Sequence, residues 1–128
     1  MSAAARGAES RQEFLMRYFE ALGAGGEFEQ FFTEDVTWTN VESGERFEGR
    51  SAVREYLLAL HGSMFDARPH GGQLSVTDEH AYLEGEFRGT SVDVRVPFCV
   101  VYDFGGEGIS AMRLYLSFAA LEPLRPRT

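Results

Sequence analysis

The stretch from Phe32 to Leu57 limits the fold of this chain more than any other segment, because its hydrophobic period changes within a few residues. Val36, Trp38 and Asn40 alternate with other residues, which predicts a strand with these three side chains on one face. After a turn and a second brief strand, the apolar period becomes helical. A strand, a turn, a strand and a helix in so short a span indicate helices packed against a sheet.

Helical spacing dominates the first half of the chain, and two-residue alternation dominates the second half. We expect helices at about residues 10–22, 27–32 and 51–61, the first of them opened by a capping box of Ser10 and Glu13. We expect the later strands near residues 73–77, 80–89, 92–104 and 109–121, after a loop that contains Pro69 and Gly71-Gly72. Pro97 predicts a bulge or an edge within one of these strands. The order of elements predicts an α+β fold.

Length and composition suit one packed domain. A chain of 128 residues with 44% hydrophobic content is long enough to bury a core, and we place the domain at residues 10–122. Residues 1–9 are expected to be disordered, and residues 123–128 are expected to form a tail.

Charge and cysteine content exclude several classes of partner. A formal net charge of −8 argues against nucleic-acid binding, and one cysteine excludes an internal disulfide. We find no secretory signal and no apolar run long enough to cross a membrane, so we expect a cytoplasmic protein with no membrane partner.

With these elements in place, the chain resembles the nuclear transport factor 2-like superfamily, which includes ketosteroid isomerases, limonene epoxide hydrolase and SnoaL-like polyketide cyclases. The resemblance covers about Glu13 to Leu121. It implies a cone-shaped fold, in which a strongly curved mixed or antiparallel sheet carries three N-terminal helices on its concave face. It also implies chemistry without a cofactor, and a homodimer formed through the outer face of the sheet.

The segment around Tyr18 resembles the first helix of ketosteroid isomerases. The resemblance implies that Tyr18 donates a hydrogen bond to a developing enolate. The general base of those enzymes, an aspartate, falls on Asn40, and their second oxyanion donor falls on Cys99. An amide cannot carry a proton as a carboxylate does, and a thiol is a weak donor. One of the three catalytic groups is therefore retained.

The segment Trp38-Thr39-Asn40 resembles the Tyr-x-Asn motif that holds water in limonene epoxide hydrolase. The amide is retained, but an indole can only donate a hydrogen bond. The last-strand aspartate of that enzyme falls on Leu114, or near Ser117 if the register slips. Its Arg-x-Asp pair falls near Glu84-Gly85-Glu86, where the arginine is absent.

Three candidate site residues each have a structural alternative. Tyr18 is either a pocket donor or a core tyrosine whose hydroxyl is satisfied by the backbone. Asn40 either holds a ligand carbonyl or a water, or is a residue that precedes a turn. Trp38 is either in contact with a ligand or part of the core.

Glu84 and Glu86 are the candidate proton carriers, and two arguments about them conflict. Alternation places both on the same strand face as Tyr82 and Arg88, which is typical of a solvated face. Register against the isomerases instead points both carboxylates inward. If they face inward, desolvation raises the pKa of the carboxyl group, which can then act as a general acid or base.

The later strands supply the expected pocket walls. By the family resemblance, one set of alternating side chains faces inward, while Arg113 and Tyr115 lie on the outer face that packs a second subunit. The expected ligand-contacting residues are Trp38, Phe98, Cys99, Met112, Leu114 and Leu116. The alternative for Cys99 is a small buried hydrophobic residue.

The three histidines lack metal-ligand spacing, so no metal is expected. They are His61, His70 and His80. We expect His70, which precedes Gly71-Gly72, to come nearest of the three to the mouth of a pocket.

These observations favour a small cofactor-free enzyme that acts by acid–base chemistry on an apolar small molecule such as a polyketide, terpenoid or steroid-like compound. The reaction would be an isomerisation, cyclisation, dehydration or hydrolysis. Tyr18 and Asn40 would orient the substrate, and Glu84 or Glu86 would move the proton. The alternative is a non-catalytic module for ligand binding or dimerisation, because neither set of catalytic residues is complete.

Overall fold

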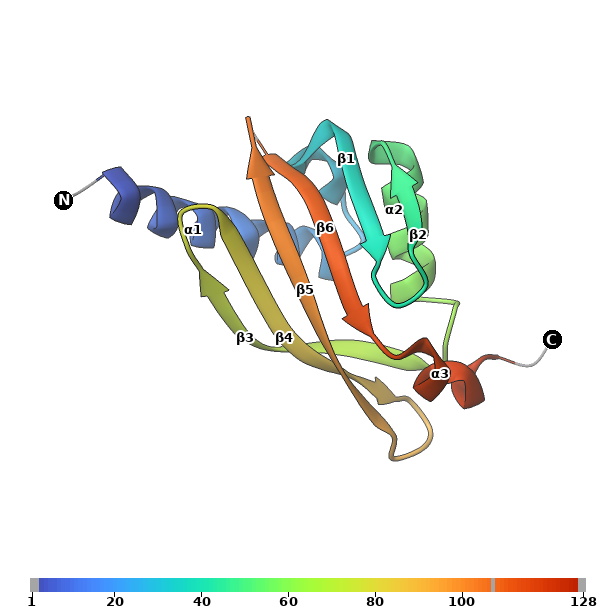
Figure 1. The fold of residues 1–128 in the computed structure, drawn as a ribbon. Coiled ribbons are helices and arrows are strands. Elements are labelled where there is room, and N and C mark those ends of the chain that lie inside the picture. The colour runs from blue at the N-terminus through green and yellow to red at the C-terminus, as the bar shows by residue number, and fades with distance from the viewer. Residues whose placement is uncertain (1–2, 107, 127–128) are drawn as a thin grey trace.

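A computed structural model of the chain describes residues 3–106 and 108–126, and it has one six-stranded sheet with two longer helices behind it (Figure 1). In chain order the elements are α1 (Ala3–Gly23), the 3-10 helix η1 (Phe28–Phe31), β1 (Phe32–Asn40), β2 (Glu45–Glu48), α2 (Arg50–His61), β3 (Ala67–Val76), β4 (His80–Gly89), β5 (Arg95–Gly105), β6 (Gly108–Leu116), α3 (Phe118–Leu121) and the 3-10 helix η2 (Glu122–Leu124). No helix in the described residues is long and apolar enough to cross a membrane.

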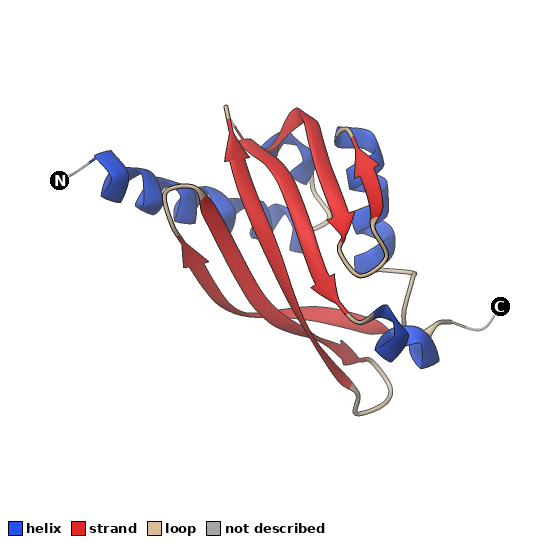
Figure 2. Ribbon diagram, viewed as in Figure 1, coloured by secondary structure: helices blue, strands red, loops and turns tan. Residues whose placement is uncertain are grey.

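The strands lie in the order β2-β1-β6-β5-β4-β3, and Figure 2 shows that the sheet curves without closing into a barrel. β1 and β6 are parallel, and the other neighbouring pairs are antiparallel, so the sheet is mixed. The pairing of β1 with β6 joins the early part of the chain to the end of the domain. The α+β fold class is therefore confirmed.

Side-chain alternation distinguishes an inner face of the sheet, which packs toward α1 and α2, from an outer face. Val36, Trp38 and Asn40 of β1 are all buried, as their two-residue spacing predicts. α2 buries its stripe of Val53, Tyr56, Leu57 and Leu60 against this core. The core thus lies between the two helices and the inner face of the sheet.

The first helix differs from its predicted start. α1 begins at Ala3, and Ser10 lies within it, so the expected capping box at Ser10 and Glu13 does not open the helix. Residues 1 and 2 lie outside the described part of the chain. The domain boundaries at residues 10 and 122 stay predictions.

The expected loop at Pro69 and Gly71-Gly72 is instead part of β3. β3 is an edge strand that pairs with β4 alone, so the missing N–H of Pro69 does not interrupt a second ladder. The register shifts between Gly71 and Gln73, which accommodates one extra residue as a β-bulge. Turn-forming residues therefore failed to predict a loop, because an edge strand tolerates them.

The C-terminal part of the expected last strand is helical. β6 ends at Leu116, and α3 and η2 follow it, burying Leu121 and Leu124 respectively in the core. Pro97 lies opposite Glu86 of β4, while the pairing of β5 with β6 begins only at Phe98. Pro97 therefore sits beyond the end of β6, in the edge-like position that a proline requires.

Candidate ligand-binding site

A cavity of about 300 Å³ lies between α1, α2 and the inner face of the sheet. Its volume is at the lower end of the range that small-molecule sites occupy. Its lining is mostly apolar and includes six aromatic side chains. The lining residues are Tyr18, Phe19, Leu22, Gly23, Trp38, Leu57, Leu60, His61, Pro69, Gly71, Leu83, Phe87, Phe98, Val100, Tyr102 and Leu114.

Two buried tyrosines stand at the α1 side of the cavity. The hydroxyl of Tyr18 reaches the Sδ of Met112 at 3.9 Å, a weak hydrogen bond, and its ring packs edge-on against Tyr102 at 6.3 Å between ring centroids. Burial raises the pKa of both phenols well above the ordinary value, so both stay neutral at physiological pH. Tyr18 thus lines the cavity, while its neutral hydroxyl is bonded to a side chain of the core.

Trp38 lines the cavity with its ring, as predicted, but its polar atom is already bonded. Its Nε1–H donates to Oδ1 of Asn40 at 2.8 Å. The ring of Tyr56 lies 6.0 Å away and extends the aromatic contact toward α2. Trp38 therefore contributes apolar surface to the cavity.

Asn40 does not line this cavity, although we expected it to supply the polar handle. Its Nδ2 donates to the hydroxyl of Tyr56 at 2.9 Å and to Oε1 of Glu45 at 3.1 Å, while its oxygen accepts from Trp38. Both amide hydrogens are engaged, so none remains for a ligand carbonyl or a water. Asn40 borders a separate depression, whose lining also includes Glu42 and Glu45.

Glu84 and Glu86 both lie on the outer face of the sheet, so the inward placement that the family register implies is not what this chain adopts. Glu84 is exposed, and Glu86 is paired with Arg88 at 2.7 Å and with Arg95 at 3.5 Å. The hydrogen bond from Arg88 holds the pKa of the Glu86 carboxyl below its ordinary value. Alternation predicted this placement correctly because Leu83 and Phe87 occupy the inner face.

Cys99 is also on the outer face, opposite Glu84 on β4 and Tyr115 on β6, and not in the cavity where we placed it. Burial raises the pKa of its thiol, and the negative charge of Glu84 raises it further. Among the expected wall residues, Phe98 and Leu114 do line the cavity. Met112 and Leu116 are buried on the inner face but do not reach the cavity surface.

His61 and Tyr102 are polar cavity residues that the sequence did not lead us to expect. His61 is the last residue of α2 and lies four positions after Leu57, so the buried stripe of this helix extends to it. Burial, and secondarily the positive charge of Arg68, lower the pKa of His61 to about 4. His61 is therefore neutral at physiological pH. The expected histidine, His70, is exposed on β3 opposite Glu86.

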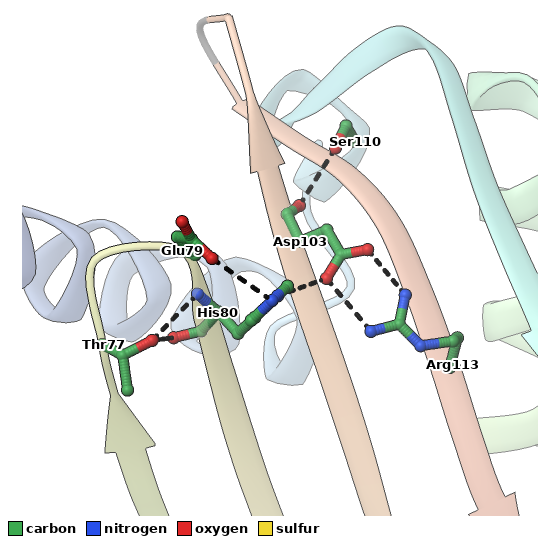
Figure 3. A network of polar contacts seen from close by, with 6 residues as sticks. All are labelled: Thr77, Glu79, His80, Asp103, Ser110 and Arg113. Carbon is green, nitrogen blue, oxygen red and sulfur yellow. Dashed lines mark hydrogen bonds and ion pairs between the residues drawn. The ribbon is translucent and has the colours of Figure 1, made fainter.

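The polar network in Figure 3 belongs to the outer face. Arg113 donates two hydrogen bonds, of 2.6 and 3.1 Å, to the carboxylate of Asp103. Nδ1 of His80 lies 2.7 Å from Oδ1 of the same carboxylate. The hydroxyl of Thr77 is hydrogen-bonded to the backbone of His80, and the hydroxyl of Ser110 donates to the backbone oxygen of Asp103. These bonds tie β4, β5 and β6 together, and they lie across the sheet from the cavity. Within the described residues, no group of three metal-ligating side chains is close enough to hold a metal ion.

Comparison with solved structures places this fold among known domains. A candidate ketosteroid isomerase from Kribbella flavida has a TM-score of 0.73 at 18% identity, covering 94% of this chain and 84% of the other. A candidate SnoaL-like polyketide cyclase from Shewanella denitrificans has a TM-score of 0.69 at 10% identity, covering 88% of this chain and 94% of the other. A third, with a ketosteroid isomerase-like fold, comes from Catenulispora acidiphila and was solved with trimethylamine, with a TM-score of 0.62, 15% identity, and coverage of 77% and 81%.

The six-stranded mixed sheet with helices over a cavity defines an α+β domain with the nuclear transport factor 2-like fold. The SnoaL-like domain family matches residues 15–112, and the chain belongs to that family. A comparison with curated proteins found no match.

Proposed function

We propose that this protein binds an apolar small molecule in the cavity between α1, α2 and the sheet. The observation that carries the proposal is the lining itself, which is largely apolar and aromatic around a volume of about 300 Å³. The candidate isomerase and candidate cyclase among the structural relatives, and the relative that holds trimethylamine, support a small-molecule site in this fold. Transfer of apolar ligand surface from water supplies the binding free energy.

Binding is the function that the geometry favours over proton transfer by a carboxylate. Among the described residues, no carboxylate lines the cavity, because Glu84 and Glu86 face the opposite side of the sheet. Asn40, in the position of the isomerase base, has both amide hydrogens engaged. The site is therefore built mainly to exclude water and hold apolar surface.

A second candidate is cofactor-free acid–base catalysis of the SnoaL-like type on the bound molecule, by isomerisation, cyclisation, dehydration or hydrolysis. The observation that favours it is His61, whose imidazole lines the cavity and is neutral at physiological pH. In this case His61 takes the role of proton carrier, and the neutral hydroxyls of Tyr18 and Tyr102 stabilise developing negative charge.

The binding proposal is tested by filling the cavity from an edge strand. Gly71 lines the cavity, and a Cβ added there would meet only the flexible side chain of Leu83, at 3.4 Å. Gly71→Leu is expected to weaken the binding of tert-butylcyclohexanol at least tenfold, while Gln73→Leu adds the same side chain at an exposed position of β3 and leaves binding unchanged. Trp38 is the only tryptophan of the chain, so its fluorescence reports binding directly.

No fluorescence change with any apolar probe in the wild-type protein would contradict the proposal. Equal binding by the wild-type and Gly71→Leu proteins would contradict the assignment to this cavity. Native mass spectrometry of the purified protein supplies an independent check, because a co-purified apolar molecule is expected to be lost in Gly71→Leu and retained in Gln73→Leu.

We also propose that two copies pair through the outer face of the sheet. Tyr82 and Tyr115 are 37% and 47% exposed on this face, and Val101 lies directly opposite Tyr82 on β5. An isologous contact would cover these apolar side chains. Sedimentation at micromolar concentration is expected to give twice the 14.3 kDa monomer mass, and Tyr115→Glu is expected to reduce it. A monomer mass for the wild-type protein would refute the pairing.

A further inference from the structure

The cavity lining includes four polar side chains, and two of them are already hydrogen-bonded within the protein. The hydroxyl of Tyr18 donates to Met112, and the indole N–H of Trp38 donates to Asn40. The two remaining polar side chains in the lining are His61 and Tyr102. Within the described residues, the hydrogen bonds of the structure include none from either of these two side chains to another protein group.

His61 and Tyr102 differ in how they face the cavity. Tyr102 is 4% exposed, and its ring packs between Tyr18 and Phe19 of α1. His61 lies at the end of α2, is only partly buried, and lines the cavity together with Pro69 and Gly71 of the edge strand β3. The imidazole is therefore the polar group best placed to meet a ligand that enters beside β3.

We infer that His61 is the specificity-determining residue of this cavity, and that the ligand is an uncharged apolar molecule whose hydroxyl or carbonyl group hydrogen-bonds to the imidazole. This inference rests on the proposed function, because it assigns the ligand class of the same cavity. A neutral imidazole has one donor and one acceptor nitrogen, so it can bond either a hydroxyl or a carbonyl.

The surroundings of His61 select against charged ligands. No carboxylate lines the cavity within the described residues, so an ammonium group would lose its hydration without gaining a counter-ion. Arg68 of β3, whose Nη1 donates to the carbonyl oxygens of Gly62 and Ala67, adds a positive charge near the imidazole. The pKa of His61 is lowered for the same reason, because its protonated imidazole is also a cation that is desolvated here and lies near the charge of Arg68. A carboxylate would face the same apolar lining, and the charge of Arg68 is already directed at two carbonyl groups.

The test uses one apolar body with different head groups. The probes are tert-butylcyclohexane and its alcohol, ketone, carboxylate and ammonium derivatives, titrated against Trp38 fluorescence at pH 7. The alcohol and the ketone are expected to bind about three- to tenfold more tightly than the hydrocarbon. This ratio of affinities corresponds to the net free energy of one hydrogen bond. The carboxylate and the ammonium ion are expected to bind more weakly than the hydrocarbon.

Variants then assign the selectivity to one residue. His61→Leu is expected to bring the ratio of alcohol to hydrocarbon affinity to about one, and His61→Gln, which keeps a donor and an acceptor, is expected to restore part of the wild-type ratio. Tyr102→Phe is expected to keep the wild-type ratio. Circular dichroism checks that each variant is folded.

Three results would overturn the inference while the binding proposal stands: equal affinity for the alcohol, ketone and hydrocarbon in the wild-type protein, tighter binding of either ion, or loss of selectivity in Tyr102→Phe instead of His61→Leu. Failure of every probe to bind would overturn the proposed function as well, so the two failures are distinguishable.

Discussion

The indole Nε1 of Trp38 donates a 2.8 Å hydrogen bond to Oδ1 of Asn40, two residues further along the same strand. Although the two residues share one face of the strand, they have different roles. Trp38 offers its ring to the cavity, and Asn40 links β1 to Tyr56 of α2 and to Glu45 of β2. The pair therefore stabilises the wall of the cavity and supplies no free polar group to a ligand.

Removal of the Asn40 amide should destabilise the fold. Asn40→Ala leaves the buried indole N–H of Trp38 without its acceptor and breaks the bonds to Tyr56 and Glu45. We expect the free energy of unfolding to fall by about 2–4 kcal/mol, measured by urea denaturation. Thr39→Ala, at the next position on the opposite face, should cost under about 1 kcal/mol. Similar losses for both variants would show that the amide network contributes little.

Two glycines that lie opposite each other in β3 and β4 should respond differently to alanine. A Cβ at Gly85 would overlap the backbone oxygen of His70 and approach Cζ of Phe98 to 2.7 Å. Gly85→Ala should therefore cost about 1–3 kcal/mol of stability and displace the Phe98 ring into the cavity. Gly71→Ala, which meets only the flexible Leu83 side chain at 3.4 Å, should change stability far less. The prediction fails if the two variants unfold at the same urea concentration.

His61 should make the protein less stable in mild acid. Its pKa is lowered to about 4 in the folded state, against an ordinary value of 6.5, so the unfolded chain binds the proton more readily. Stability is therefore lost as the pH falls from about 6.5 to about 4, and is constant with respect to this group outside that window. Between pH 7 and pH 5 we expect a loss of about 2 kcal/mol from this residue. His61→Gln should remove that part of the pH dependence in urea denaturation, and an unchanged slope would refute the assignment.

Asp103 should contribute stability that acid removes. The hydrogen bonds from Arg113, followed by the contact with His80, lower the pKa of its carboxyl below the ordinary value of 3.8. The contribution is present above this ordinary value and is lost as the pH falls through the lower, folded-state pKa. Arg113→Gln should raise the pKa of Asp103, followed by NMR of the carboxyl carbon. Arg95→Gln, which removes a partner of the distant Glu86, should leave the pKa of Asp103 unchanged.

The sequence predicted local geometry well and contacts between distant elements poorly. Alternation correctly assigned the faces of β1 and β4, because a strand has a strict two-residue period. The register borrowed from the isomerases would have turned Glu84 and Glu86 inward, since a shift of one residue reverses every side chain of a strand. His61 follows Leu57 by four residues, and this spacing indicates a place on the buried stripe of α2. We did not assign His61 to the stripe because it is the last residue of the helix.

The sequence by itself determined most of the order of helices and strands, the apolar faces of β1 and α2, and the place of Trp38 in the wall of the cavity. These features depend on propensity and period, which are properties of neighbouring residues. Only the tertiary structure decided which polar groups meet the cavity. The partners of Asn40 come from α2 and β2, whereas His61 meets the cavity where α2 ends beside β3. Hydrogen-bond partners and desolvation arise between elements that are distant in the chain, so no local pattern encodes them.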